Sequence, residues 1–120
     1  KSLKIIAMRM MRLGKELVER HYAEHVGKVF YEKLVDYMVS APVIAMVVEG
    51  EGAIEYLRRL AGATDPREAP AGTIRGDFAI QTRMNLIHAS DSSASAMREI
   101  GLFFDESDIC PWEDGNESWY

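Results

Sequence analysis

The sequence predicts an α+β fold in which a small antiparallel sheet carries helices on one face. One observation indicates this class, and two more indicate a single globular domain. Apolar segments rich in β-branched residues alternate with segments in which apolar residues recur at helical spacing. The length of 120 residues suits a single domain, residues 1–120, with one core. A content of 48% hydrophobic and 28% charged residues is ordinary for a globular protein.

The first half of the chain predicts one strand followed by two helices. Residues 3–11 are apolar and partly alternating, which indicates a strand. Gly14 breaks that pattern, and residues 15–25 then place apolar side chains along one helical side. Residues 30–39 repeat the helical spacing, and Pro42 is expected to end that helix.

The second half predicts a strand, a helix, a long loop, a strand and a helix. Residues 43–50 form a continuous apolar strand of the buried kind, and residues 53–60 have helical spacing. Residues 62–76 lack any period, and a loop of this length in a compact domain is usually functional or mobile. Residues 84–88 are expected to form the third strand, and residues 92–103 the last helix.

Composition limits the classes of function. The longest apolar run, residues 43–48, is far shorter than the roughly 20 residues of a membrane span. No secretory signal pattern begins the chain, and the lone Cys110 is compatible with a reducing compartment, so we expect a cytoplasmic protein. A net charge of −5 makes nucleic acid an unlikely partner, although a local cluster of arginines can still bind phosphate.

His88 is the first candidate for chemistry, because it stands where the third strand is expected to end. An imidazole titrates near pH ~6.5, so its neutral, nucleophilic form dominates at neutral pH. Ser90 and Asp91 have the character of helix N-cap residues, and Glu99 on the last helix is placed to orient the imidazole. The alternative is a structural histidine with its hydrogen bonds satisfied, and the spacing alone leaves both interpretations open.

Arginines on either side of the long loop are the second candidate. Arg58 and Arg75 bracket residues 62–76, which also contain Thr64. Arginine binds phosphate in a bidentate manner and stabilises charge on a transferring phosphoryl group. Arg58 and Arg59 could equally form the solvated side of a helix. The glycines on either side of Arg75, in the segment GTIRGD, favour a tight backbone that aims this one side chain.

Other kinds of site find little support. His21 and His25 have the i, i+4 spacing of a metal-binding pair, but no further histidine or cysteine completes a set, so no metal site in the protein is predicted. The chain has neither a GxSxG nucleophile elbow nor the usual glycine-rich phosphate-binding loops.

Three segments carry a resemblance to a known family. HYAEHVGKVFYEKLVDYMVSAPVIAMVVEG, GATDPREAPAGTIRGDFA and NLIHASDS resemble the nucleoside diphosphate kinases, from Lys4 to about Phe104, and the N-x-x-H-[GA]-S-D motif is highly specific. The resemblance implies a ferredoxin-like βαββαβ core. It also implies transfer of the terminal phosphate from a nucleoside triphosphate to a nucleoside diphosphate, by a ping-pong path through a phosphohistidine.

The resemblance assigns a role to each candidate residue. His88 matches the nucleophile, Tyr22 the tyrosine beside it, and Ser90 and Glu99 the residues that support it from behind. The positions that match nucleotide contacts are Phe30, Leu34, Arg58, Thr64, Arg75 and Asn85, with Phe30 stacking on the base. Mg²⁺ is expected on the nucleotide phosphates, and not on a metal site of the protein.

The resemblance also sets expectations about completeness and assembly. The family's first strand and first helix, which carry an active-site lysine, have no counterpart here, so the chain is expected to be N-terminally incomplete. The alternative function is that of a truncated, catalytically weak homologue that binds nucleotide or serves as an assembly subunit. The family is hexameric or tetrameric, which implies a homo-oligomer. Residues 62–76 are then expected to help pack the subunits, and residues 111–120 to cover a neighbouring surface.

Overall fold

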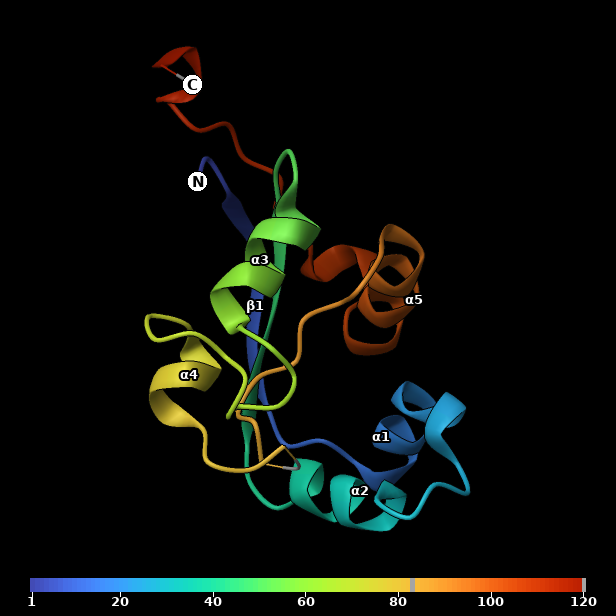
Figure 1. Cartoon of the computed structure of the whole chain (residues 1–120). Helices are drawn as coiled ribbons and strands as arrows, with labels where there is room; N and C mark the ends of the chain where they lie inside the picture. The colour runs from blue at the N-terminus through green and yellow to red at the C-terminus, as the bar shows by residue number, and fades with distance from the viewer. Residues whose placement is uncertain (83, 120) are drawn as a thin grey trace.

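Among the residues that the structure describes, two strands pair into one antiparallel sheet (Figure 1). This computed structural model describes residues 1–82 and 84–119. Strand β1 is Lys4–Met11 and strand β2 is Val43–Glu49, which confirms the first two predicted strands. Met8 lies opposite Met46 in the register, and a bulge interrupts the pairing between Ile5 and Ala7. The sheet and its helices confirm the α+β class.

The helices between the strands are shorter than the spacing predicts. Helix α1 is Lys15–His21, and a single 3₁₀ turn, Ala23–His25, replaces the last part of the predicted helix. The helix ends because Tyr22, with φ −104° and ψ 26°, leaves the helical region. Helix α2 is Tyr31–Val39, one residue shorter than expected at its start.

In the described part of the chain, three α-helices follow β2. Helix α3 is Ala53–Ala61, helix α4 is Ile74–Phe78 and helix α5 is Ser93–Phe103. Two 3₁₀ turns, Glu106–Asp108 and Glu117–Trp119, lie in the C-terminal tail.

Helix α4 begins inside the segment that was expected to be all loop. The Thr73 hydroxyl caps it by accepting a hydrogen bond from the Gly76 N–H. Gly76 lies so close to the Pro70 carbonyl that a side chain at this position would collide with it. The tight backbone expected around Arg75 is therefore a capped helical turn.

The prediction of a third strand over residues 84–88 is wrong. In the described residues this segment contributes only one isolated bridge, between Gln81 and Met84. The backbone then reverses at Leu86, whose φ of 72° is left-handed, and the Ile87 N–H donates to the Asn85 carbonyl at 2.9 Å. This is a γ-turn, a rare and strained conformation that cannot continue a strand. The apolar residues of this segment misled the prediction, because periodicity does not reveal such a turn.

Two apolar clusters hold the elements together. Ile6, Ala7 and Val47 pack with Phe104, so the end of α5 covers one face of the sheet. Leu13, Val18 and Val35 form the second cluster, which joins α1 to α2. Phe103 packs against both clusters and so connects α5 to α1. This connection places the carboxylate-bearing helix α5 beside the histidine at the end of α1.

The C-terminal tail runs beside β1 of its own chain. The Cys110 N–H donates to the Ile6 carbonyl at 2.7 Å, and the Trp112 Nε1–H donates to the Ile5 carbonyl at 2.9 Å. Part of the segment that was expected to cover a neighbouring subunit therefore covers its own strand, and Tyr120 lies outside the described residues. Among residues 1–82 and 84–119, no helix has the length and apolar character needed to cross a bilayer.

Candidate active site

His88 and Glu99 form the centre of the site. His88 lies on the irregular segment that follows the γ-turn, and its side chain is 41% exposed, whereas Glu99 on α5 is buried. The His88 Nε2 atom lies 2.8 Å from Oε1 of Glu99 and 3.0 Å from Oε2. The nucleophile and the orienting carboxylate expected from the sequence are therefore in contact.

This contact fixes which nitrogen of His88 carries a proton. A carboxylate is only an acceptor, so Nε2 must carry the proton and donate it to Glu99. In the neutral imidazole the other nitrogen, Nδ1, then has the free lone pair. Glu99 therefore selects this tautomer.

Ser90 supports the same carboxylate. Its hydroxyl donates to Oε2 of Glu99 at 2.9 Å, which orients the carboxylate towards His88. The expectation that Ser90 and Asp91 cap α5 is wrong, since the N-cap is Ser92, whose hydroxyl accepts from the Ser95 N–H. The hydroxyl of Ser90 is used by Glu99 instead.

Two aromatic side chains from the end of α1 pack against the His88 ring. The Tyr22 ring centroid lies 6.3 Å away and that of His21 only 4.7 Å away, both edge to face. Burial raises the pKa of Tyr22 to about 12, with a smaller contribution from the charge of Glu99. Burial also lowers the pKa of His21 to about 4, and electrostatic repulsion from the neighbouring His88 contributes to the shift.

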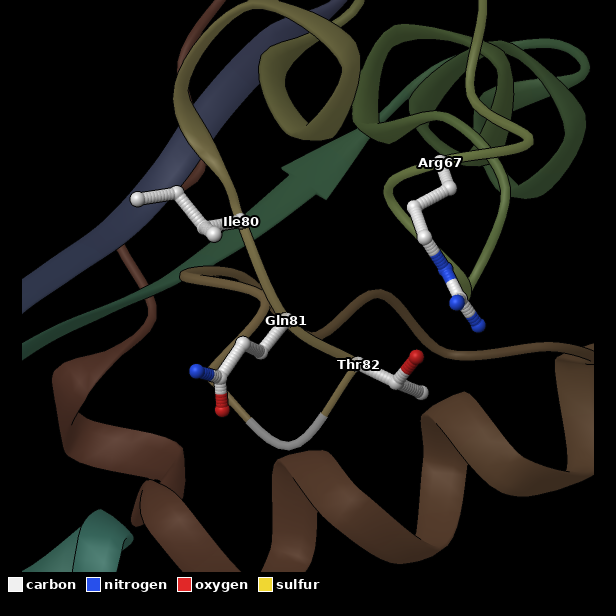
Figure 2. A pocket seen from close by; sticks show the side chains of 4 residues that line it. All are labelled: Arg67, Ile80, Gln81 and Thr82. Atoms are coloured by element: carbon white, nitrogen blue, oxygen red, sulfur yellow. The ribbon is translucent and has the colours of Figure 1, made fainter.

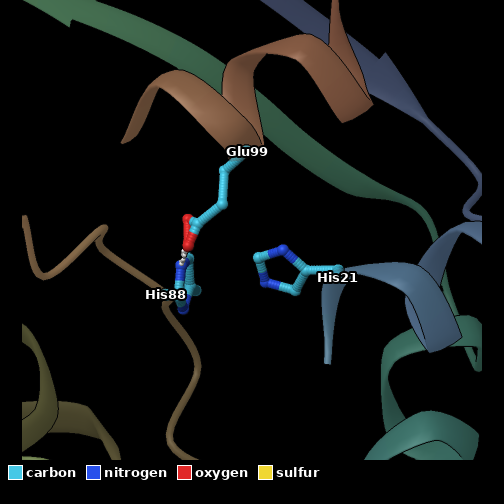
Figure 3. A group of neighbouring side chains, drawn as sticks. All are labelled: His21, His88 and Glu99. Carbon is cyan, nitrogen blue, oxygen red and sulfur yellow. Dashed lines mark hydrogen bonds and ion pairs between the residues drawn. The ribbon is translucent and has the colours of Figure 1, made fainter. Parts of the chain in front are cut away.

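His21 is the residue that the sequence analysis placed wrongly. Only 4% of its surface is exposed, and its ring also packs edge to face on Phe103. It was considered as a partner of His25, but the fold brings it to His88 and Glu99 instead (Figure 3). The signal that could have found it is its spacing of three residues from the fully buried Val18.

The two arginines contact the backbone carbonyls of the residues immediately before and after His88. Arg75 on α4 is buried and donates to the carbonyls of Ile87, at 2.6 Å, and Gly62, at 2.9 Å. Arg58 on α3 donates to the carbonyl of Ala89 at 2.8 Å. Burial lowers the pKa of Arg75, and the charge of Arg58 contributes. The expected arginines are therefore brought to the two residues that flank His88.

The remaining candidates surround this centre. The Asn85 amide donates to the Thr64 carbonyl at 3.3 Å, which ties the long loop to the γ-turn. Phe30 precedes α2 and is 39% exposed, and Leu34 lies one helical turn beyond it. The centroids of Tyr22 and His25 are 5.9 Å apart and those of His25 and Phe30 are 5.6 Å apart. A row of rings therefore leads from His88 to Phe30.

Two surface hollows lie among the described residues. The larger, about 590 Å³, is lined by Arg58, Gly62, Thr73 and Asp91 among others, so it opens beside the arginine that contacts Ala89. The smaller, about 280 Å³, is lined by Arg67, Ile80, Gln81 and Thr82 (Figure 2) and contains none of the candidate residues.

A histidine held at Nε2 by a buried carboxylate, with two arginines beside it, is typical of an enzyme that transfers phosphoryl groups through histidine. The comparisons with known proteins agree. The family model described as nucleoside diphosphate kinase matches residues 1–109. The chain belongs to the nucleoside diphosphate kinase family, which transfers the terminal phosphate between nucleoside tri- and diphosphates.

Individual relatives support this membership. The chain is 55% identical to the nucleoside diphosphate kinase of Archaeoglobus fulgidus, over 99% of this chain and 79% of the relative. It is 57% identical to that of Methanothermobacter thermautotrophicus, over 94% of this chain and 75% of the relative. A halophilic nucleoside diphosphate kinase from Halobacterium salinarum, solved in complex with CDP, superposes with a TM-score of 0.95 at 43% identity, covering 98% of this chain and 79% of that one. The expected family and its ferredoxin-like fold are thereby confirmed.

Proposed function

We propose that this chain performs the family reaction by a ping-pong path in which Nδ1 of His88 accepts and then donates the phosphoryl group. The observation that carries the proposal is the hydrogen bond from Nε2 of His88 to the buried Glu99. It leaves Nδ1 as the free nucleophile on a side chain that is 41% exposed. A structural histidine with both nitrogens satisfied would not have this arrangement.

The first half-reaction follows from this tautomer. The Nδ1 lone pair attacks the terminal phosphorus of the nucleoside triphosphate and forms a P–N bond. The bond from that phosphorus to the bridging oxygen breaks, and the nucleoside diphosphate leaves with the electron pair. The imidazole becomes positive as this happens, and its Nε2–H remains on the Glu99 carboxylate, which stabilises the charge. A second nucleoside diphosphate reverses these steps.

Arg58 and Arg75 stabilise the charge of the transferring phosphoryl group. Arg58 is exposed and uses one hydrogen bond on the Ala89 carbonyl, which leaves further N–H donors for phosphate oxygens. Arg75 is buried behind the His88 segment, so it contributes its charge and the rigidity of the backbone.

Phe30 is the surface on which we expect the base to stack. Its exposed ring face accepts any base, since every base has a π-face, and this suits an enzyme that acts on several nucleosides. Leu34 borders the same entrance, and we expect Thr64 and Asn85 to contact phosphate and sugar. The CDP complex of the Halobacterium salinarum relative supports a nucleoside diphosphate as ligand.

Asp91 fits the Mg²⁺ ion that accompanies the nucleotide. This ion takes oxygen ligands, usually substrate phosphates with one or two carboxylates. Asp91 lines the larger hollow together with Arg58, and a hydrogen bond from the Ser95 side chain lowers the pKa of its carboxyl group. When bound, Mg²⁺ neutralises charge on the phosphates.

We also propose that the protein acts in the cytoplasm as a homo-oligomer. The free thiol of Cys110 is exposed, which suits a reducing compartment. Met8, Met10, Ile44 and Met46 are exposed on one face of the sheet, and apolar patches of this kind often pack against another surface. Light scattering coupled to gel filtration measures the assembly, and a monomer at micromolar concentration would contradict it.

Labelling with γ-labelled ATP tests the nucleophile. The wild-type protein should take up label that is acid-labile, base-stable and released by any nucleoside diphosphate. His88→Ala should take up none, whereas His25→Ala, a second histidine outside the contact with Glu99, should keep the label. A wild-type protein that binds nucleotide in equilibrium dialysis yet takes up no label would favour the alternative, a catalytically weak homologue.

A further inference from the structure

We propose that His21, His88 and Glu99 form a binding site for a divalent cation of the Zn²⁺ class, and that a cation bound there silences the nucleophile. The silencing rests on the proposed function of His88, whereas the binding site stands on the geometry of the three side chains. One donor atom from each residue lies within 4.8 Å of the others. Figure 3 shows His21 approaching from the end of α1, Glu99 from α5 and His88 from the irregular segment that precedes α5.

The unpartnered nitrogen of His21 is the observation that points to a ligand. His21 is only 4% exposed, and its Nδ1 atom is buried without a hydrogen-bond partner among the described residues. Buried polar atoms normally have partners, so an orphan of this kind calls for an explanation. A phenylalanine would fill the same space and keep the ring contacts with no polar atom. Packing therefore does not account for a histidine at this position.

The other histidine and the cysteine of the chain are placed differently. The sequence has three histidines and one cysteine. The Nδ1 atom of His25 lies 3.0 Å from Nζ of Lys28, and Cys110 is bonded through its backbone to β1. The imidazoles of His21 and His88 therefore converge on the buried carboxylate of Glu99. The sequence had suggested His21 and His25 as the pair.

The distances require only a local adjustment. Nε2 of His88 is already 2.8 Å from Oε1 of Glu99. Zinc holds nitrogen and oxygen ligands at about 2.0–2.2 Å, so two ligands of one ion are at most about 4.4 Å apart. The donor atoms of the three side chains now lie within 4.8 Å of one another. A rotation of the His21 ring that shortens this separation by several tenths of an ångström brings it below about 4.4 Å.

The donor set selects the kind of metal. Imidazole nitrogens suit zinc and its neighbours, whereas Mg²⁺ prefers oxygen ligands, so this site differs from the one for the nucleotide's Mg²⁺. Three protein ligands leave a fourth position for water, as in sites that exchange their metal or bind substrate.

Binding at this site has a direct consequence for Nδ1. A cation on Nε2 uses the lone pair of that nitrogen, so the proton that Nε2 carried moves through solvent to Nδ1 and the imidazole stays neutral. With the metal on Nε2 and the proton on Nδ1, neither nitrogen keeps a free lone pair, so Nδ1 cannot attack phosphorus. Metal binding and phosphorylation of His88 therefore compete.

Metal binding is tested without nucleotide, so that its failure is separate from failure of the kinase reaction. Equilibrium dialysis of the full chain against Zn²⁺ should find one ion per chain, and Co²⁺ should give the visible absorption of a low-coordinate site. His21→Phe and Glu99→Gln should each weaken binding at least tenfold. His25→Ala and Cys110→Ser are the matched controls and should bind as the wild type does.

Labelling by γ-labelled ATP with Mg²⁺ then tests the silencing, with each variant compared with its own zinc-free rate. The wild-type rate should fall in proportion to zinc occupancy, and the rate of His21→Phe should resist the same zinc concentration. Absence of bound metal, or equal binding by His21→Phe, overturns the site. Occupancy of the site without slower labelling overturns the silencing alone. Circular dichroism checks that His21→Phe is folded, and if it is not, Glu99→Gln and the cobalt spectrum decide.

Discussion

Glu99→Gln is the substitution that probes the site most directly. The amide has the shape of the carboxylate but carries no charge, and it can present either an acceptor or a donor to Nε2 of His88. If it presents its oxygen, the Nε2–H tautomer survives with a weaker hydrogen bond. If it presents its NH₂ group, Nε2 becomes the acceptor and Nδ1 carries the proton, which abolishes nucleophilic attack. Both outcomes slow phosphorylation of His88.

The magnitude follows from the contacts of Glu99. Nε2 lies 2.8 Å and 3.0 Å from its two oxygens, and the carboxylate is only 8% exposed, so the hydrogen bond is charge-assisted and poorly screened. Such a bond contributes about 1.5–3 kcal/mol, and this contribution grows as the imidazole becomes positive in the transition state. At 1.4 kcal/mol for each factor of ten, loss of about 2 kcal/mol slows phosphorylation roughly 30-fold.

Rapid-quench measurement of the first phosphorylation by γ-labelled ATP gives this rate without interference from product release. Glu106→Gln, an exposed glutamate after α5, is the matched control and should react at the wild-type rate. Thermal unfolding of both variants separates a kinetic effect from loss of fold. A folded Glu99→Gln protein that is labelled within twofold of the wild-type rate would refute the role of this carboxylate in selecting Nδ1.

Three further predictions concern stability and pH. The pKa of His21 falls from 6.5 to about 4 on folding, so the unfolded state binds a proton first as the pH drops. The free energy of unfolding should therefore be highest above pH 6.5 and decline by up to about 3 kcal/mol towards pH 4. Urea unfolding across this range in the presence of a chelator, compared with His21→Phe, should show a shallower decline for the variant. Val18→Ala, at a position 1% exposed, should lower the free energy of unfolding by about 2–3 kcal/mol, whereas Val29→Ala, fully exposed, should change it by less than about 0.5 kcal/mol. Since the pKa of Tyr22 is about 12, its phenol stays protonated below pH 10, and Tyr22→Phe should leave the alkaline limb of the pH profile of kcat/KM unchanged there. A shift of this alkaline limb in Tyr22→Phe would show that the phenol titrates in the reaction.

The fold could be predicted wherever it depends on the period of apolar residues. Both strands of the sheet and helices α2, α3 and α5 follow that period within a residue or two. Helix α4 could not be found this way, because it has five residues and owes its start to the Thr73 cap and to the close approach of Gly76 to Pro70. The strand predicted at residues 84–88 failed for a related reason, since the conformation of Leu86 depends on distant partners and not on its neighbours in sequence.

In the candidate site, too, some residues could be placed from the sequence and one could not. A specific motif pointed to His88 as the centre of the site. Glu99 was predicted as the nearest carboxylate that could reach the imidazole, and the distance of 2.8 Å between them confirms this contact. His21 was misplaced because its spacing to His25 suggested a pair, whereas α1 ends at His21 and the chain turns His25 away towards Lys28. The residue at which α1 ends therefore decides which histidine packs against His88.

The strained turn before His88 explains why the arginines occupy their places. A leucine at φ 72° costs about 1–3 kcal/mol and persists only when the surroundings hold it. Arg75 donates a hydrogen bond to the carbonyl of Ile87, next to Leu86. Arg58 donates one to the carbonyl of Ala89, so hydrogen bonds hold the backbone on both sides of His88. Each guanidinium therefore holds the backbone beside His88, and in the reaction that we propose it also adds positive charge near the arriving phosphoryl group. Because position and charge come from one guanidinium, lysine at either position would keep the charge and lose the fork geometry that holds the turn.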